Sequence, residues 1–429
     1  MQAFPSLSFC WQLFRFSLVS LPYLYFAVFP GFFVVMGQLL AKFRRTALEP
    51  ITGYLVLAIT GFLLLSSLAA ANREEALLQL ANFLPYLLLF SLLPYLLQPL
   101  TRLGQLATDV VIATIPINLL ALLEYVLRSE FIPRWVRRLP LARWYRSRPH
   151  VGRAMVMFGH PNALAGYLVL ILGLGLGLLL YHAQQQSVLK TDGRGDRLRR
   201  TLLYIGTFAC LLGIFSSGSR NGLLVALSQL LLVCLFAKPS RKLAIAGLMG
   251  VVGLIAGAAL LGIGRRSLDP AAWTNDPRIE VWRFAGELIQ QRPWLGWGLG
   301  NFKLLYPPGL IPDYEYIAHP HNVWLLLAAE AGLPMMMLFT LFVGRICYRA
   351  VRRLITGSLP SSESAILLAY LLSFWGCLAF ALFDVTFYDA RINAMHWVVL
   401  AGLYTLVEAA PQIPQSDNPT EQPDAAQRS

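Results

Sequence analysis

The residues best suited to chemistry are two histidines that directly precede an apolar stretch. The run His319-Pro320-His321-Asn322 is followed at once by VWLLLAAEAGL. If this stretch is a helix, Asn322 can cap it, and the positive end of the helix dipole disfavours a charged imidazole beside it. A neutral imidazole can accept a proton near pH 7, so the pair offers a candidate general base. A simple cap by Asn322 beside inert histidines is the alternative.

Two arginines could bind an anionic group near such a base. Arg220 lies in SSGSRNG, residues 216–222, a short connection in which Gly218 permits a tight reversal. Arg278 lies at the start of NDPRIEVWRFAGELIQQRP, residues 275–293. A guanidinium can bind phosphate oxygens in bidentate fashion, which makes both arginines candidate phosphate ligands. For Arg220 the alternative is a snorkelling arginine at a membrane boundary.

The segment 275–293 also predicts its own helix. Pro277 suits the first helical position and Pro293 ends the run. Its apolar residues recur at helical spacing and are Ile279, Trp282, Ala285, Leu288 and Ile289. One face is therefore apolar, as expected for a helix that lies along a membrane surface. Arg278 and Trp282 are four residues apart and share a face.

Other polar residues near these motifs are weaker candidates. The spacing of the two histidines, with Asp313 and Glu315 nearby, could suggest a metal site, but this set is nonspecific and we expect no metal and no cofactor. Glu330 lies inside the apolar run and is a candidate functional or ion-paired carboxylate, with Glu124 a weaker case. Glu330 is about 13 Å along a helix from His321, which excludes a direct pair.

Two further stretches could approach a ligand. FGHPNALAGYL offers His160 and Asn162 at the expected start of a helix, although a capped helix start explains them equally well. PWLGWGLGNF contains three glycines, Gly296, Gly298 and Gly300, which permit close backbone approach to a ligand. An ordinary turn is the more frequent explanation of such a pattern.

Composition sets the class of protein. The 429 residues are 57% hydrophobic and 13% charged, which excludes a soluble globule and predicts an all-α polytopic membrane protein. We expect about eleven spans, within a range of ten to twelve. They are 16–41, 51–71, 76–98, 109–127, 163–181, 201–217, 221–237, 243–263, 323–344, 364–383 and 392–409. Residues 16–41 could instead form a hairpin broken at Pro22 and Pro30, but they are too few for two full crossings.

We expect one membrane domain over residues 1–410 and a disordered, polar tail over 411–429. The cations of one set of connections are Lys42, Arg44, Arg45, Arg102, Lys190, Arg194, Arg197, Arg199, Arg200, Lys238, Arg241, Lys242, Arg345, Arg349, Arg352 and Arg353. The short opposite connections carry single cations, so this set should face the cytoplasm. The large loop 265–322, with its amphipathic helix, is then extracytoplasmic.

Two long loops on that outer side weaken the difference in positive charge between the two sides of the membrane. Loop 128–153 holds eight cations and loop 265–322 holds six. Arginines retained on the unfavoured side suggest an anionic partner there, and a solvated or headgroup-facing surface is the other interpretation.

Taken in order, SGSRNG, DPRIEVWRFAGELIQQRPWLGWGLGNF and HNVWLLLAAEAGL resemble the O-antigen ligase and polymerase superfamily. The resemblance covers about 205–345, with FGHPNALAGYL as an outlying match. It implies the integral-membrane glycosyltransferase fold and an inverting, metal-independent glycosyl transfer at the outer face of the cytoplasmic membrane. The implied donor is a glycan on a polyprenyl diphosphate, and the acceptor is a hydroxyl of a lipid-linked sugar, a growing polysaccharide or a protein.

Carried over by position, the resemblance makes His321 the base that deprotonates the acceptor, and Arg220 and Arg278 the groups that bind the diphosphate. Further substrate contacts are expected among Arg283, Arg265, Arg266, His319, Asn322, Trp282, His160, Asn162 and Glu330. Membrane lipids are the other expected partners, and no nucleic acid is expected.

Two other classes remain open at this stage. A transporter would use intramembrane carboxylates such as Glu330 and Glu124, and some relatives of the superfamily have been assigned to inorganic-carbon uptake. We find no clear internal repeat of the kind that many transporters show. A scaffold or lipid-binding protein would use the same arginines for headgroups alone, with binding but no turnover.

Overall fold

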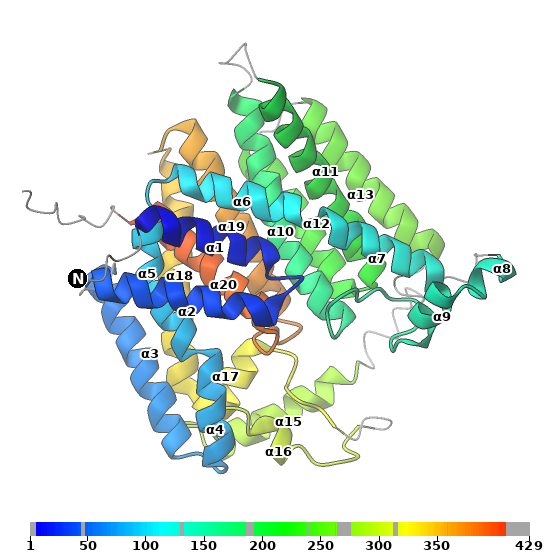
Figure 1. The fold of residues 1–429 in the computed structure, drawn as a ribbon. Coiled ribbons are helices and arrows are strands. Elements are labelled where there is room, and N and C mark those ends of the chain that lie inside the picture. The colour runs from blue at the N-terminus through cyan, green and yellow to red at the C-terminus, as the bar shows by residue number, and fades with distance from the viewer. Residues whose placement is uncertain are drawn as a thin grey trace, which may run out of the picture.

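The computed structural model describes residues 6–43, 48–128, 133–185, 193–237, 241–261, 263, 276–311, 316–357 and 359–408. These residues form helices joined by loops, and no strand occurs among them (Figure 1). In chain order the elements are α1 (Leu7–Ser20), α2 (Tyr25–Lys42), α3 (Pro50–Leu68), α4 (Arg73–Gln79), η1 (Leu80–Asn82), α5 (Leu84–Leu97), α6 (Thr101–Ala113), α7 (Ile115–Arg128), α8 (Arg134–Arg137), α9 (Pro140–Ser147), α10 (Pro161–Gln185), α11 (Arg194–Ser217), α12 (Arg220–Ala237), α13 (Arg241–Leu261), α15 (Arg278–Gln291), α16 (Phe302–Leu305), α17 (Val323–Ala331), α18 (Leu333–Thr356), α19 (Ser361–Ala381) and α20 (Ala390–Val407).

Seven helical stretches of the described residues are long and apolar enough to cross a membrane. They are Pro50–Leu68, Arg73–Leu97, Thr101–Arg128, Pro161–Ala183, Arg194–Ser217, Leu333–Thr356 and Ser361–Ala381. The chain is therefore an all-helical, multi-pass membrane protein. Three more predicted spans are helical as well, namely α12, α13 and α20. The total of about eleven spans stays a prediction, and the tail 411–429 lies outside the described residues.

The prediction of one span over residues 16–41 is wrong. The chain instead forms α1 and α2, which lie side by side and reverse between Leu21 and Leu24 (Figure 1). Pro22 in this reversal has no N–H to continue a helical ladder, whereas Pro30 is accommodated inside α2. Because α1 begins at Leu7, well before the predicted span, there is enough chain for two helices.

The predicted span 323–344 is divided as well, into α17 and α18. The break is at Gly332, whose φ of 90° is accessible to glycine and costly for other residues. A Cβ at this position would lie 2.2 Å from the carbonyl oxygen of Trp294. The loop that follows α15 therefore packs directly onto the break, and the absence of a side chain permits that approach.

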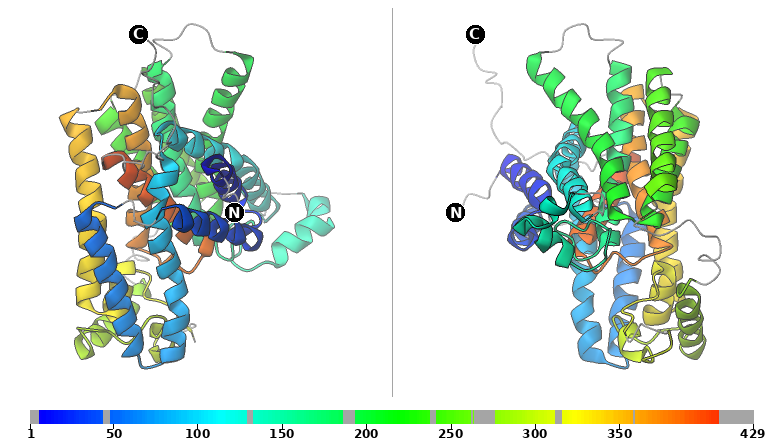
Figure 2. Two further views of the ribbon diagram at one scale, coloured as in Figure 1. Left: turned by 60° about the vertical axis from the view of Figure 1, so that its left-hand side comes forward. Right: turned by 90° about the vertical axis from the view of Figure 1, so that its right-hand side faces the viewer.

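Helix α10 is the central element of the bundle. It is almost entirely buried and packs against α19, α11, α12 and α6 (Figures 1 and 2). A Cβ at Gly177 would lie 2.3 Å from the backbone of Ala369 in α19, so small residues set this close helix pair. α15 and α16 lie together beyond α17, at one end of the molecule (Figure 1).

Candidate active site

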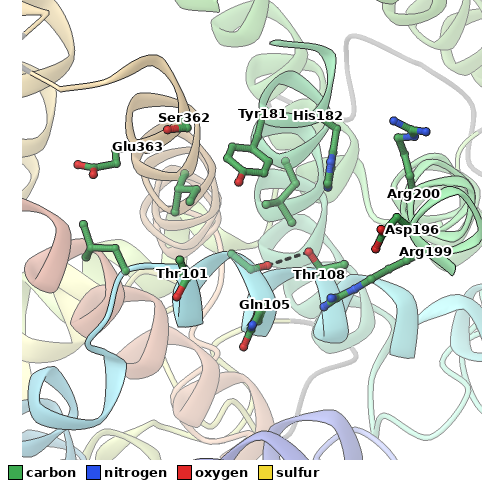
Figure 3. Close-up of a pocket in the computed structure, with 14 residues that line it drawn as sticks. Thr101, Gln105, Thr108, Tyr181, His182, Asp196, Arg199, Arg200, Ser362 and Glu363 are labelled. Carbon is green, nitrogen blue, oxygen red and sulfur yellow. Dashed lines mark hydrogen bonds between the residues drawn. The ribbon is translucent and has the colours of Figure 1, made fainter. Parts of the chain in front are cut away.

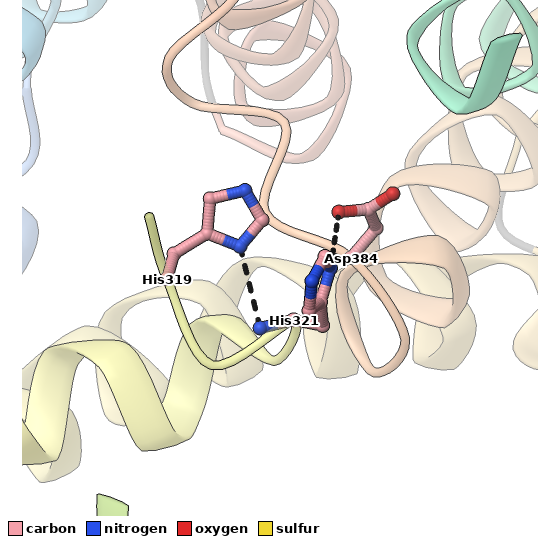
Figure 4. Close-up of side chains that lie close together, drawn as sticks. All are labelled: His319, His321 and Asp384. Atoms are coloured by element: carbon pink, nitrogen blue, oxygen red, sulfur yellow. Dashed lines mark hydrogen bonds and ion pairs between the residues drawn. The ribbon is translucent and has the colours of Figure 1, made fainter. Parts of the chain in front are cut away.

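The predicted base lies beside a carboxylate from a distant part of the sequence. His321 Nδ1 is 3.2 Å from Asp384 Oδ1, in the loop between α19 and α20 (Figure 4). The side chain of Asp384 is 10% exposed and that of His321 is 32% exposed, so the imidazole can be reached from solvent. If Nδ1–H donates to the carboxylate, Nε2 carries the free lone pair. This is the tautomer that a general base acting through Nε2 needs.

The local backbone holds His321 in a defined position. Asn322 accepts the N–H of Leu325 at 3.0 Å, which confirms the predicted cap, and its side-chain amide donates to the carbonyl of Leu382. His321 itself has a φ of 51°, a left-handed conformation that is uncommon outside glycine. Its N–H donates to His319 Nδ1 at 3.3 Å. Such a conformation needs a surrounding structure that enforces it.

A second helix fixes the same segment from another direction. Trp282 Nε1 of α15 donates to the carbonyl of Pro320 at 2.8 Å. Arg278 is one turn earlier on the same face of α15, so this face is directed toward the histidine segment. The Arg278 guanidinium lies 3.7 Å from the Asp276 carboxylate and its side chain is 25% exposed. Arg283 instead pairs with Glu280 at 2.9 Å on an exposed face.

The turn that carries Arg220 is connected to the same carboxylate. Asn162 Nδ2 donates to Asp384 Oδ2 at 2.8 Å, and Asn162 Oδ1 accepts from Arg153 at 2.7 Å. Arg153 also donates through Nε to the carbonyl of Ser217 at 3.0 Å. Ser217 ends α11, and Arg220 begins α12 after a reversal in which Gly218 has a φ of 60°. One chain of hydrogen bonds thus joins the Arg220 turn to the His321–Asp384 pair.

The electrostatics of the site keep two imidazoles uncharged. Burial lowers the pKa of His319 to about 4, and His321 acts in the same direction while Asp384 opposes it. Burial also lowers the pKa of His160 to about 4, with His150 adding to the effect. Burial alone would raise the pKa of Asp384, but its hydrogen bond with His321 and the positive charge of an imidazolium there lower it below the ordinary value. At neutral pH the site therefore combines an ionised carboxylate with neutral His319 and His160.

The matching family model covers the elements that carry most of these groups. Residues 205–340 match the family model described as O-antigen ligase. About a third of the chain is thus similar to this family, in agreement with the predicted resemblance to the O-antigen ligase and polymerase superfamily. The O-antigen ligase region contains Arg220, Arg278 and His321, and it ends before Asp384. The match supports a membrane enzyme with a glycosyltransferase-like activity. No curated protein matches the chain.

The site residues of the O-antigen ligase region, residues 205–340, contact residues outside it that the sequence did not single out. Asp384 and Arg153 were not predicted as site residues. The available signal for Asp384 was its place in the short connection between two predicted spans, on the same expected side as His321. Arg153 was visible only as one of eight cations in loop 128–153. His160 and Asn162, by contrast, were predicted and do join this group.

Glu330 is buried in the O-antigen ligase region and binds backbone groups there. Its side chain accepts the N–H groups of Gly300 and Phe302 at 2.8 and 3.0 Å, and its residue is 1% exposed. The backbone carbonyl of Glu330 accepts the N–H of Gly298. A Cβ at Gly296 would lie 2.5 Å from that same carbonyl group. The glycine-rich loop therefore approaches the end of α17, rather than a ligand, and Glu330 holds it there.

The other predicted candidates divide by location. Arg265, Arg266, Asp313 and Glu315 lie outside the described residues.

His319, His321 and Asp384 could bind a cation, since one ligand atom from each lies within 4.8 Å of the others. In the structure, however, His319 Nδ1 accepts a backbone N–H, and both Asp384 oxygens accept hydrogen bonds from Val385 and Asn162. These hydrogen bonds link the three side chains and leave Nε2 of both histidines unused.

A separate cavity of about 500 Å³ lies at the other end of α10 (Figure 3). Tyr181 and His182 line it, together with Asp196 and Arg199 of α11. Tyr181 is nineteen residues beyond Asn162 on the same helix, which separates the two places by about 30 Å. We therefore do not assign this cavity to the His321 site.

Proposed function

We propose that the chain is a glycosyltransferase that moves a glycan from a polyprenyl diphosphate to an acceptor hydroxyl, at the extracytoplasmic face of the cytoplasmic membrane. The observation that supports this most is the chain of contacts through Ser217, Arg153, Asn162, Asp384 and His321. It links the Arg220 turn to the histidine segment, which in turn contacts the helix of Arg278 through Trp282.

In the proposed reaction, the acceptor oxygen attacks the anomeric carbon of the donor glycan. His321 Nε2 removes the hydroxyl proton, and Asp384 stabilises the imidazolium that forms. The bond between the anomeric carbon and the phosphate oxygen breaks, and the diphosphate leaves with the electron pair. Arg220 and Arg278 bind the leaving diphosphate and stabilise its growing negative charge. Attack opposite the leaving group inverts the anomeric centre, and no step needs a metal.

A small apolar pocket of about 40 Å³ lies next to the site. Val323 and Trp324, directly after Asn322, line it together with Phe387, which follows Asp384 by three residues. Phe339 of α18 lines it from a third side. The pocket offers apolar contact beside the polar groups, with room for no more than a small part of a hydrocarbon chain.

The test is transfer by the purified protein in a membrane, with polyprenyl-diphosphate glycan and candidate acceptors. We expect His321→Ala, Arg220→Ala and Arg278→Ala each to lower the rate about 100- to 1000-fold, the usual cost of losing one preorganised group. The two arginine variants should also bind the donor more weakly, whereas His321→Ala should bind it normally. Arg352→Ala, at an exposed position near the far end of α18, is the matched control and should keep full activity.

Two results would overturn the proposal. Undiminished transfer by His321→Ala would remove the general base from the mechanism. Ion uptake into proteoliposomes without any transfer would favour the transporter alternative, which no finding on the described residues supports.

A further inference from the structure

The basic loop 128–153, which the proposed reaction uses only through Arg153, contains a small helical projection. α8 and α9 form a hairpin, residues 133–148, that follows the membrane-length stretch Thr101–Arg128. Its helices have four and eight residues, too few to cross a membrane. Figures 1 and 2 show the hairpin extending sideways from the helical bundle.

One face of the hairpin is attached to the end of α7. Ala142 and Tyr145 are buried against Leu127. Arg148 forms an ion pair with the buried Glu124 at 3.2 Å, and Arg146 donates to the carbonyl of Arg128 at 3.3 Å. These contacts hold the hairpin at the end of the membrane-length stretch Thr101–Arg128.

The hairpin also exposes large apolar side chains. Trp135 is 69% exposed, Leu139 46%, Leu141 50% and Trp144 56%. Leu141 and Trp144 are three residues apart on α9 and share a face. Four such side chains within ten residues are costly to keep in water. Tryptophan and leucine on one face of a short helix are typical of the membrane interface.

The hairpin is strongly positive. Arg134, Arg138 and Arg143 are exposed, and residues 133–151 contain no Asp or Glu. The Arg148 guanidinium carbon lies 5.3 Å from the centre of the Trp144 ring. Arg148 is already paired with Glu124, so the exposed Arg134, Arg138 and Arg143 are the groups offered to phosphates, which at a membrane surface belong to anionic lipids.

We propose that the hairpin 133–148 is an interfacial anchor that inserts Trp135 and Trp144 between lipid headgroups and acyl chains while its arginines bind anionic headgroups. The anchor acts on the bilayer itself and does not depend on the proposed glycosyl transfer. It also accounts for the arginines that are retained in this loop.

The insertion is tested by fluorescence quenching with the full-length protein in membranes containing lipids brominated near the headgroup end of the acyl chain. The difference in emission between wild type and the double variant Trp135→Phe/Trp144→Phe isolates this pair among the ten tryptophans. We expect brominated lipid to quench the pair's emission about twofold or more relative to ordinary lipid. Trp397→Phe is the control, because Trp397 is 3% exposed in α20. Its removal should leave the amount of emission lost to brominated lipid unchanged.

The headgroup preference is tested by placing the bromine either on an anionic or on a zwitterionic lipid at equal mole fraction. An arginine near an anionic surface strengthens association about fivefold, so the anionic lipid should quench the pair more in the wild type. In the triple variant Arg134→Gln/Arg138→Gln/Arg143→Gln, the anionic lipid should lose most of its advantage over the zwitterionic lipid in quenching the pair. The proposal would be overturned if no membrane quenched the pair, as expected for side chains that face water or protein. Equal quenching of the wild type by both lipids would overturn the role of the arginines.

Discussion

Replacing Asp384 by Asn tests whether the His321–Asp384 contact sets the tautomer of the base. Asp384 Oδ2 accepts from Asn162, and Oδ1 accepts from Val385 and faces His321 Nδ1. An Asn side chain has only one acceptor oxygen. If that oxygen meets Asn162, the amide donates to His321 Nδ1 and forces the proton onto Nε2. If that oxygen faces His321 instead, the NH₂ group of the new Asn side chain meets the NH₂ group of Asn162, and neither can accept a hydrogen bond. Either orientation breaks one contact of the site.

The size of the effect follows from the distance. At 3.2 Å an imidazolium and a carboxylate attract by about 5 kcal/mol at an effective dielectric constant of 20. Solvent reduces this value, because the His321 side chain is 32% exposed. We therefore expect Asp384→Asn to lower kcat about 100- to 1000-fold, the range typical of losing one preorganised electrostatic partner.

The assay is steady-state transfer together with direct measurement of donor binding. Asp384→Asn should lower kcat with little change in donor affinity, since the arginines are intact. Asp384→Glu keeps the charge and should recover part of the rate. Glu280→Gln, on the exposed side of α15, is the control and should behave as wild type. Transfer by Asp384→Asn at the wild-type rate would refute the positioning role.

Three other outcomes follow from the same structure. Prolonged treatment with a chelator should leave the transfer rate unchanged; a loss that one divalent cation restores would mean that His319, His321 and Asp384 hold a metal. Gly332→Ala should lower the free energy of unfolding by more than about 1 kcal/mol, because φ is 90° and the new Cβ would meet a backbone oxygen at 2.2 Å. Thermal unfolding measures this, and an unchanged transition would contradict the packing at the break. The pKa values of His160 and His319, both about 4, lie below the ordinary 6.5, so the unfolded chain binds protons first as pH falls. Their contribution to stability is present above pH 6.5 and is lost as pH falls through about 4, and replacing both by Gln should flatten the acid limb of a pH–stability curve.

The sequence alone determined the features that depend on neighbouring residues. Apolar runs of membrane length predict the helical class, because a backbone in lipid must satisfy its hydrogen bonds within the segment. The start of α17 at Asn322, the reversal at Gly218 and the helix α15 were all predicted from local signals. Each rests on a cap, a positive φ or a periodicity that spans a few residues. The likeness to a family in the region 205–345 was visible for the same reason, since its motifs are short and continuous.

Only the tertiary structure decided which groups meet. Asp384 is 63 residues from His321 in sequence, and Arg153 reaches both Ser217 and Asn162 only because α10 and α11 pack together. Glu330 was expected to act on a substrate, yet its carboxylate binds backbone N–H groups of a loop 28 and 30 residues earlier. Residues 16–41 were compatible with one helix or two. Contacts of this kind depend on how helices pack, and packing joins residues whose separation along the chain carries no local signal.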